Sequence, residues 1–182
     1  MRRPAPRLLA AGLVAIATTA IASAIVPAAR AAPPPLAHAA LVHGDGSPAG
    51  TAIIRREHGR AVLHVALTGI PAGIHGIHLH AVGQCAGPGF ASAGGHLNPM
   101  MLQHGTLNPA GHHLGDLPNV TADAAGKVAA TLPLEGPVPH LLDALFDADG
   151  TALVVHAGPD DYKTDPSGNS GARIACGVLI RG

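Results

Sequence analysis

Short apolar segments separated by turn residues make up the chain from Ala37 onward. His58-Gly59-Arg60 stands between two of these segments and predicts a hairpin. No segment shows a long helical period, so the pattern predicts an all-β antiparallel sandwich or barrel. Residues 83–120 and 157–172 are too long for passive turns and indicate functional loops. Strands are predicted at residues 41–43, 51–57, 61–67, 74–82, 127–134, 151–156 and 173–180.

The start of the chain differs in composition from the rest. A basic N-terminus precedes an almost wholly apolar run from Leu8 to Val26, and Ala29-Arg30-Ala31 then offers a small-residue cleavage site. This pattern predicts a signal peptide at residues 1–31 rather than a retained membrane anchor. We expect residues 32–36 to be a linker and residues 37–182 to be one exported domain, in the periplasm, the cell wall or the medium.

Cleavage after residue 31 would change the charge of the protein. The 11 basic residues fall to 7, because Arg2, Arg3, Arg7 and Arg30 are removed, while all 11 acidic residues stay, for a net charge of about −4. A mildly acidic domain without basic runs is a poor match for nucleic acid. We therefore expect neither a nucleic acid nor, after cleavage, a membrane as partner.

The placement of the histidines indicates metal binding. His78 and His80 are two apart in a predicted strand, so they share a face, and His156 ends another strand that could join them. His75 falls outside this register and is expected either to support a ligand from behind or to have a packing role. Imidazole nitrogens are common ligands of zinc and copper. Ordinary surface roles are expected for His38, His43, His58, His64, His112 and His140.

A second set of candidate ligands lies in the first long loop. It consists of His96, His104, His113 and Asp116. A turn would bring His113 and Asp116 together, because they are three residues apart. Three imidazoles and one carboxylate suit a closed tetrahedral zinc site of structural type.

Two cysteines remain to be explained. An even count in an exported chain predicts a disulfide between Cys85 and Cys176. Its loop of about 90 residues corresponds to roughly 4–5 kcal/mol in the chain-entropy model.

Several motifs resemble those of the copper,zinc superoxide dismutase family, in its bacterial exported branch. The resemblance covers about residues 37–182, in family order, and implies an eight-stranded Greek-key β-barrel, an immunoglobulin-like sandwich, with long metal-binding and electrostatic loops. The matching motifs are G-I-H-G-I-H-L-H, S-A-G-G-H-L-N-P, H-G, H-L-G-D-L-P-N, L-V-V-H and P-S-G-N-S-G-A-R-I-A-C-G-V.

The resemblance implies a role for each candidate residue. His96 would bridge the two metals, Asp160 would link a ligand of each, and Arg173 would dock the substrate beside copper. Cys85 and Cys176 match the family disulfide. The implied copper ligands are His78, His80, His96 and His156. The implied zinc ligands are His96, His104, His113 and Asp116. His112 leaves open a shift of the zinc site by one residue, although the three-residue step to Asp116 favours His113.

The implied reaction converts superoxide to dioxygen and hydrogen peroxide, as a defence outside the cytoplasm. His96 and Arg173 would be catalytic, with copper and zinc as cofactors. A non-catalytic copper or zinc buffer on the same barrel is the alternative, which the full copper set and Arg173 disfavour. A secreted zinc hydrolase is disfavoured because the sequence lacks the motif H-E-x-x-H. Lys163 is a field-focusing charge or a solvated one, and Ser167 narrows a channel or fills a turn. Both monomer and homodimer remain open.

Overall fold

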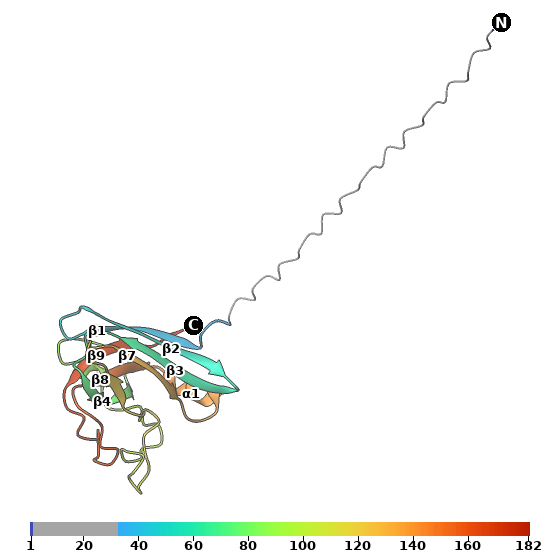
Figure 1. The fold of residues 1–182 in the computed structure, drawn as a ribbon. Coiled ribbons are helices and arrows are strands. Elements are labelled where there is room, and N and C mark those ends of the chain that lie inside the picture. The colour runs from blue at the N-terminus through green and yellow to red at the C-terminus, as the bar shows by residue number, and fades with distance from the viewer. Residues whose placement is uncertain (2–32) are drawn as a thin grey trace. The chain divides into compact units, whose positions relative to one another are not determined.

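Strands form most of the regular structure in the described chain, and their inward positions are apolar. A computed structural model describes Met1 and residues 33–182, with Pro33–Gly182 as one unit (Figure 1). The predicted signal peptide, apart from Met1, and the first residue of the predicted linker therefore lie outside the described residues. Across the described part of the chain, helices are all too short or too polar to cross a membrane.

Within residues 33–182 the elements follow one another as strands with two short helices. The strands are β1 (Ala37–His43), β2 (Pro48–Glu57), β3 (Arg60–Leu67), β4 (Gly73–His75), β5 (Ile77–His80), β6 (Val120–Ala122), β7 (Val128–Pro133), β8 (Ala152–His156), β9 (Arg173–Val178) and β10 (Ile180–Arg181). A 3₁₀ helix spans Ala91–Ala93, and α1 spans Val138–Leu145.

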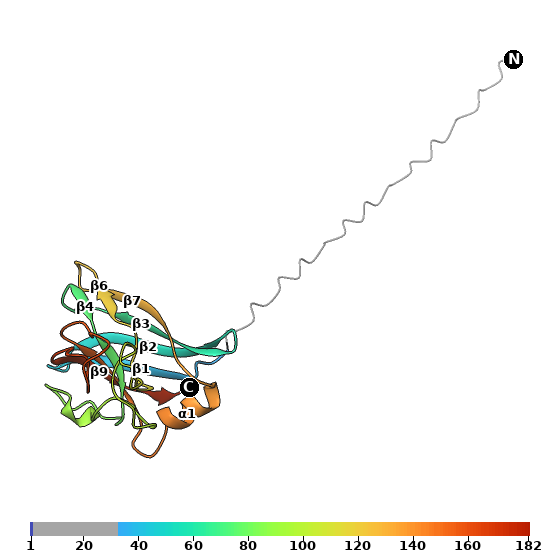
Figure 2. The same ribbon diagram turned by 90° about the horizontal axis from the view of Figure 1, so that it is seen from below.

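The main sheet is antiparallel and curled, with the strand order β5-β8-β9-β1-β2-β3-β7, and β10 pairs with β1. A small sheet of β4 and β6 lies beside it (Figure 2). Because β4 leads into β5 and β6 leads into β7, the small sheet joins the two ends of the large one. The predicted all-β antiparallel architecture is confirmed.

The core is aliphatic, since the sequence has only two Phe, one Tyr and no Trp. Leu63, Leu79 and Leu153 are each fully buried. Burying such a side chain stabilises the fold by about 1.5–3 kcal/mol. A smaller apolar cluster around Phe90 and Val154 adjoins Cys176 and Cys85. The strands that carry His78, His80 and His156 are thereby packed against the apolar core, which fixes their backbone.

Two local features differ from the predicted pattern. The strand predicted at 74–82 is interrupted at Gly76, whose N–H donates to the Gly158 carbonyl and whose carbonyl accepts from His156 N–H, both at 2.8 Å. Helix α1 was not predicted, because eight residues between Pro137 and Phe146 are too few to show a period. Its buried residues, Val138, Leu141 and Leu145, are nevertheless spaced by three and four.

Candidate metal centre

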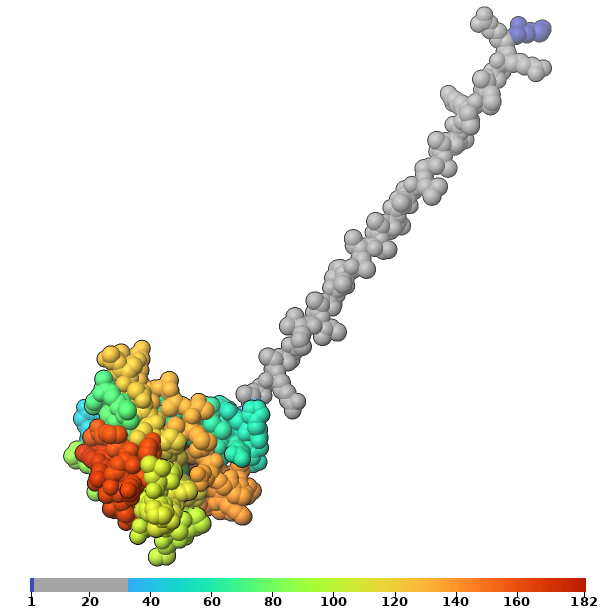
Figure 3. All heavy atoms as spheres, turned by 60° about the horizontal axis from the view of Figure 1, so that its bottom comes forward, coloured from blue at the N-terminus to red at the C-terminus, as the bar shows by residue number. Residues whose placement is uncertain are grey.

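The candidate ligands meet at one end of the barrel. β5 supplies His78 and His80, and β8 supplies His156. The loop between β5 and β6 supplies the remaining histidines, and the loop between β8 and β9 supplies Asp160. These two loops lie side by side on one face (Figure 3) and are joined by a bond from Leu107 N–H to the Tyr162 carbonyl at 2.9 Å.

The first cluster contains four buried histidines. Their candidate ligand atoms all lie within 4.8 Å of one another in the group His78, His80, His96 and His156. Three rings are anchored through their outer nitrogen. His80 Nδ1 donates to the Gly94 carbonyl at 2.9 Å and His156 Nδ1 to the Gly171 carbonyl at 3.1 Å. His78 Nε2 donates to Asp160 Oδ2 at 2.7 Å. Anchoring the outer nitrogen as a donor leaves the inner nitrogen with a lone pair for a metal.

The second cluster converges on one carboxylate. The Nδ1 atoms of His96, His104 and His113 lie 2.8, 2.9 and 3.3 Å from Asp116 Oδ1. Asp116 Oδ2 accepts the backbone N–H groups of Gly105 and His113, both at 2.9 Å. Those two bonds fix the carboxylate, so three nitrogens and one oxygen surround a common point, as tetrahedral zinc requires.

His96 is the one residue shared by the two clusters. Its Nδ1 faces Asp116, and its buried Nε2 faces the first cluster with no hydrogen-bond partner among the described residues. Both nitrogens of one ring therefore point toward candidate metal positions.

Asp160 connects the two clusters from behind. Its Oδ2 accepts from His78, and its Oδ1 accepts from His104 Nε2 at 3.0 Å. Asn119 holds the backbone of Asp160 with two bonds of 2.9 Å, one from Asn119 Nδ2 to the Asp160 carbonyl and one from Asp160 N–H to Asn119 Oδ1. Asn119 ends the motif H-L-G-D-L-P-N, yet nothing in the sequence marks it as the partner of Asp160.

Arg173 lies at the edge of the first cluster with its guanidinium fixed. Nη1 donates to the Phe90 carbonyl and Nη2 to the Gly94 carbonyl, both at 2.7 Å. Gly94 is also the acceptor for His80, so Arg173 and His80 share one anchoring carbonyl. Burial lowers the pKa of Arg173, but a guanidinium stays charged at neutral pH.

Burial keeps the first cluster neutral. It lowers the pKa of His80 to about 2 and those of His96 and His156 to about 4, and it also lowers the pKa of His78. At physiological pH these rings carry no charge, so their lone pairs are available to a metal.

His104 behaves in the opposite way. Burial opposes its charge, but the carboxylates of Asp116 and Asp160 outweigh that effect and raise the pKa of His104 to about 9. The same contacts hold the pKa values of both carboxyl groups below their usual range. The two buried carboxylates thus favour a positive charge between them. A divalent cation would supply such a charge.

Unpartnered nitrogens test whether metals fit these clusters. His78 Nδ1, His96 Nε2 and His113 Nδ1 are buried and lack a hydrogen-bond partner within the described residues. Leaving a buried polar atom unpaired costs about 1–3 kcal/mol. The three atoms all face the clusters, where imidazole donors suit copper and an N₃O set suits zinc. The donor sets fit both metals.

The other predicted residues lie outside the clusters. The buried ring of His75 has its nitrogens 2.8 Å from the His156 carbonyl oxygen and 2.7 Å from that of Pro71, so it packs in the core and also contacts the backbone of a candidate ligand. Lys163 is exposed and Ser167 half-buried. None of the six histidines expected at the surface belongs to a cluster in the described chain.

The structure contains the predicted disulfide between Cys85 and Cys176, with Cα atoms 5.7 Å apart. Cys176 lies on β9, three residues after Arg173. The disulfide therefore attaches the loop that carries Phe90 and Gly94 to the strand that carries Arg173.

Comparisons with known proteins agree with this geometry. Residues 48–179 match the family model described as copper/zinc superoxide dismutase (SODC). The chain is similar to "Superoxide dismutase [Cu-Zn] 2" of Aquifex aeolicus, 42% identical over 79% of this chain and 85% of that protein. It is 44% identical to "Superoxide dismutase [Cu-Zn]" of Caulobacter vibrioides over 75% of this chain and 80% of that protein.

A solved structure of a SOD-like protein from Bacillus subtilis superposes with a TM-score of 0.71, at 39% identity over 79% of this chain and 97% of that one. The predicted fold class and family are confirmed, and copper, zinc and an oxidoreductase activity are what this family implies. The chain belongs to the copper/zinc superoxide dismutase family.

Proposed function

We propose that this protein dismutates superoxide at a copper site whose neighbouring zinc site is structural. Copper is held by His78, His80, His96 and His156. Zinc is held by His96, His104, His113 and Asp116. The observation that carries this assignment is the His96 ring, which offers Nε2 to one cluster and Nδ1 to the other.

The reaction consumes two superoxide ions and two protons, and yields one dioxygen and one hydrogen peroxide. When bound, copper supplies the one-electron chemistry, and zinc, which has no redox chemistry, supplies fixed charge and geometry. His96 Nε2, when it does not hold copper, would take up one proton and deliver it to the reduced product, and water would supply the second proton. The His96 ring keeps its orientation during this transfer, because Nδ1 is held beside Asp116.

Arg173 binds the substrate. Its guanidinium is fixed by two carbonyls next to His80, so a small anion that reaches the cluster meets a fixed cationic donor. A guanidinium that is already oriented loses little side-chain entropy on binding. Lys163 is exposed on the loop that carries Asp160, and its backbone lies beside Gly105 and Asn108. A contribution of Lys163 to the arrival rate of superoxide stays a prediction.

Metal analysis together with a superoxide assay tests the proposal. We expect one copper and one zinc per chain and cyanide-sensitive dismutation. Zinc alone, with no activity after copper loading, would instead identify a metal buffer.

The variant Arg173→Ala tests substrate docking separately. It should keep both metals, dismutate at least tenfold more slowly and lose much of its salt dependence. Equal rates in the two proteins would rule out the docking role.

We further propose that the protein is exported after cleavage near residue 31 and works in the periplasm, the cell wall or the medium as a soluble monomer or homodimer, without nucleic acid. The intramolecular disulfide supports an oxidising compartment. N-terminal analysis of protein from cell fractions would test export, and sedimentation would give the oligomeric state.

A further inference from the structure

The second cluster is closed on almost every side. The side chains of His104, His113 and Asp116 are 0%, 7% and 3% exposed. An ion that binds there must therefore come through a defined opening. A cavity of about 200 Å³ lies against Asp116 and is also lined by Thr106 and Glu135.

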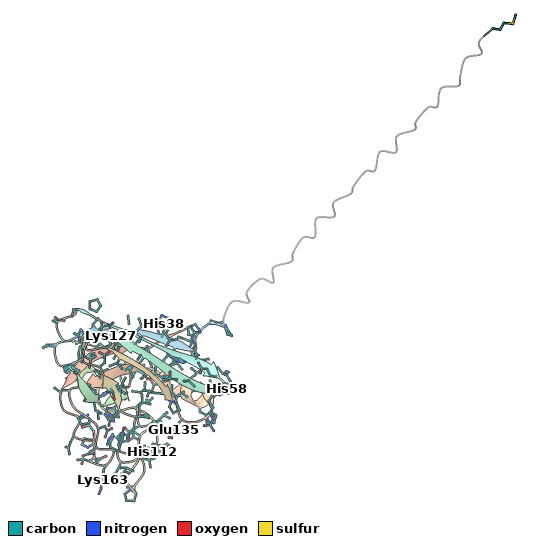
Figure 4. The ribbon with its side chains drawn as sticks, viewed as in Figure 1. His38, His58, His112, Lys127, Glu135 and Lys163 are labelled. Atoms are coloured by element: carbon teal, nitrogen blue, oxygen red, sulfur yellow. A yellow bond between two sulfur atoms is a disulfide. The ribbon has the colours of Figure 1, made fainter. Side chains whose placement is uncertain are left out.

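Glu135 lies at the outer side of this cavity and pairs with His112. Figure 4 labels the two residues, which lie close together. Glu135 Oε2 and His112 Nε2 are 2.8 Å apart, and the side chains of Glu135 and His112 are 63% and 35% exposed. His112 directly precedes His113, whose buried Nδ1 has no hydrogen-bond partner in the described structure and faces the cluster. A path of candidate metal ligands therefore leads from solvent inward, from Glu135 to His112 and then to His113.

The charges on the two sides of the centre are opposite. The lining of the Asp116 cavity contains the carboxylates of Asp116 and Glu135 and neither Lys nor Arg. The first cluster is instead flanked by Arg173, whose charge acts on His80 and His156. The two lining carboxylates attract a cation into this cavity, although Arg60 lines the adjoining cavity with Glu135. Arg173 repels a cation from the side that receives superoxide.

We infer that the cavity between Glu135 and Asp116 is the route by which zinc reaches its site, and that Glu135 and His112 bind the ion at the mouth. This inference rests on the proposed function, because it takes His113 and Asp116 as zinc ligands. The hydrated ion replaces the bond between Glu135 and His112, and any proton on His112 is lost to water. It then moves inward to Asp116.

A role on the zinc route predicts different kinetics from a role in supporting His113. The pair acts on the route and not on the final site. It therefore accelerates zinc uptake and zinc release by the same factor, and leaves the dissociation constant unchanged. A pair that only supported His113 would change the dissociation constant, mainly through faster release.

The experiment compares Glu135→Gln with Glu57→Gln. Glu57 forms a similar, half-buried pair with His64 at 2.7 Å on the β2–β3 hairpin, which carries none of the cluster ligands. Zinc release from the loaded protein to a chromogenic chelator, and uptake of Zn²⁺ by the chelator-stripped chain, are followed by stopped flow. We expect Glu135→Gln to slow both about fivefold at low salt, and Glu57→Gln to change neither.

Thr106 gives a second test that leaves the Glu135–His112 pair intact. Its exposed side chain lines the same cavity. We expect Thr106→Lys to slow uptake and Thr106→Asp to accelerate it, each by about threefold at low salt, and both effects to fade at high salt.

Two results would overturn the inference. One is a weaker dissociation constant with unchanged uptake in Glu135→Gln, which would make the pair a support for His113. The other is an absence of any effect in both Glu135→Gln and the Thr106 variants, which would place the route elsewhere. Zinc stoichiometry distinguishes a failure of this inference from a failure of the proposed function. A chain that holds no zinc at all would refute the proposed function.

Discussion

Replacing Asn119 by alanine removes the clamp on Asp160 and little else. The amide of Asn119 makes one bond from Asp160 N–H and one to the Asp160 carbonyl, both 2.9 Å long. The backbone N–H of Asn119 donates to the Tyr162 hydroxyl at 2.7 Å, and this bond survives the substitution. The carboxylate that links His78 to His104 then lacks its backbone support.

The loss can be given a magnitude. Each of the two bonds contributes a net of about 0.5–1.5 kcal/mol, and water replaces part of it because Asn119 is only half-buried. We expect Asn119→Ala to lower the free energy of unfolding by about 1–2 kcal/mol, which corresponds to a fall in Tm of about 3–6 °C for a domain of this size.

Calorimetry of the zinc-loaded protein would measure the loss, and ¹⁵N NMR of the ring N–H groups would report its cause. The Nε2–H signals of His78 and His104 should move, because both donate to Asp160. Asn98→Ala is the matched control. Its amide also makes two bonds, of 2.8 and 3.0 Å, to the backbone of Leu102 within the same loop.

Equal losses of Tm in the two variants, with both ring signals unmoved, would refute the reasoning. The hydrogen bonds of Asn119 would then stabilise the loop in the ordinary way, and the orientation of Asp160 would depend on other contacts.

Three further changes have expected outcomes. Cys85→Ser opens a disulfide spanning 91 residues and should cost about 4–5 kcal/mol by the chain-entropy model; an unchanged denaturation midpoint would contradict this. Gly168→Ala, at φ +62°, places a Cβ against the Asp160 carboxylate and should weaken zinc binding at least tenfold in chelator competition. In the metal-free chain the pKa of His104 rises from 6.5 to about 9, so its stabilisation is complete below pH 6.5 and lost as pH rises through 9; Tm should fall over that range, and a flat profile would exclude the effect.

The strand pattern was predictable because its physical cause is local. Alternation places Leu63, Val65 and Leu67 on one face of β3, and the structure buries all three. Where a boundary depends on a distant segment, the pattern failed. The break at Gly76 is set by bonds to Gly158 and His156, which lie about 80 residues away along the chain. Nothing near Gly76 in the sequence shows those partners.

The candidate ligands could be found from the sequence for a similar reason. A step of two on a strand and a step of three in a turn are geometric statements, so His78 with His80 and His113 with Asp116 follow from spacing alone. The residues that orient them follow no such rule. The amide of Asn119 binds the backbone of Asp160, and the backbone carbonyls of Gly94 and Gly171 orient His80 and His156. In each case one partner is a backbone group that every residue has, so the sequence does not mark the pairing. The cavity beside Asp116 likewise depends on segments distant in sequence.

The contacts around Gly94 show why stability and substrate docking are coupled in this fold. One carbonyl anchors the outer nitrogen of His80 and one arm of Arg173, and Phe90 in the same loop anchors the other arm. That loop is attached to β9 by Cys85 and Cys176. Reduction of the disulfide therefore frees the segment that orients both a candidate copper ligand and the docking arginine. Loss of order at the first cluster must accompany the loss of stability, because the same backbone segment is responsible for both.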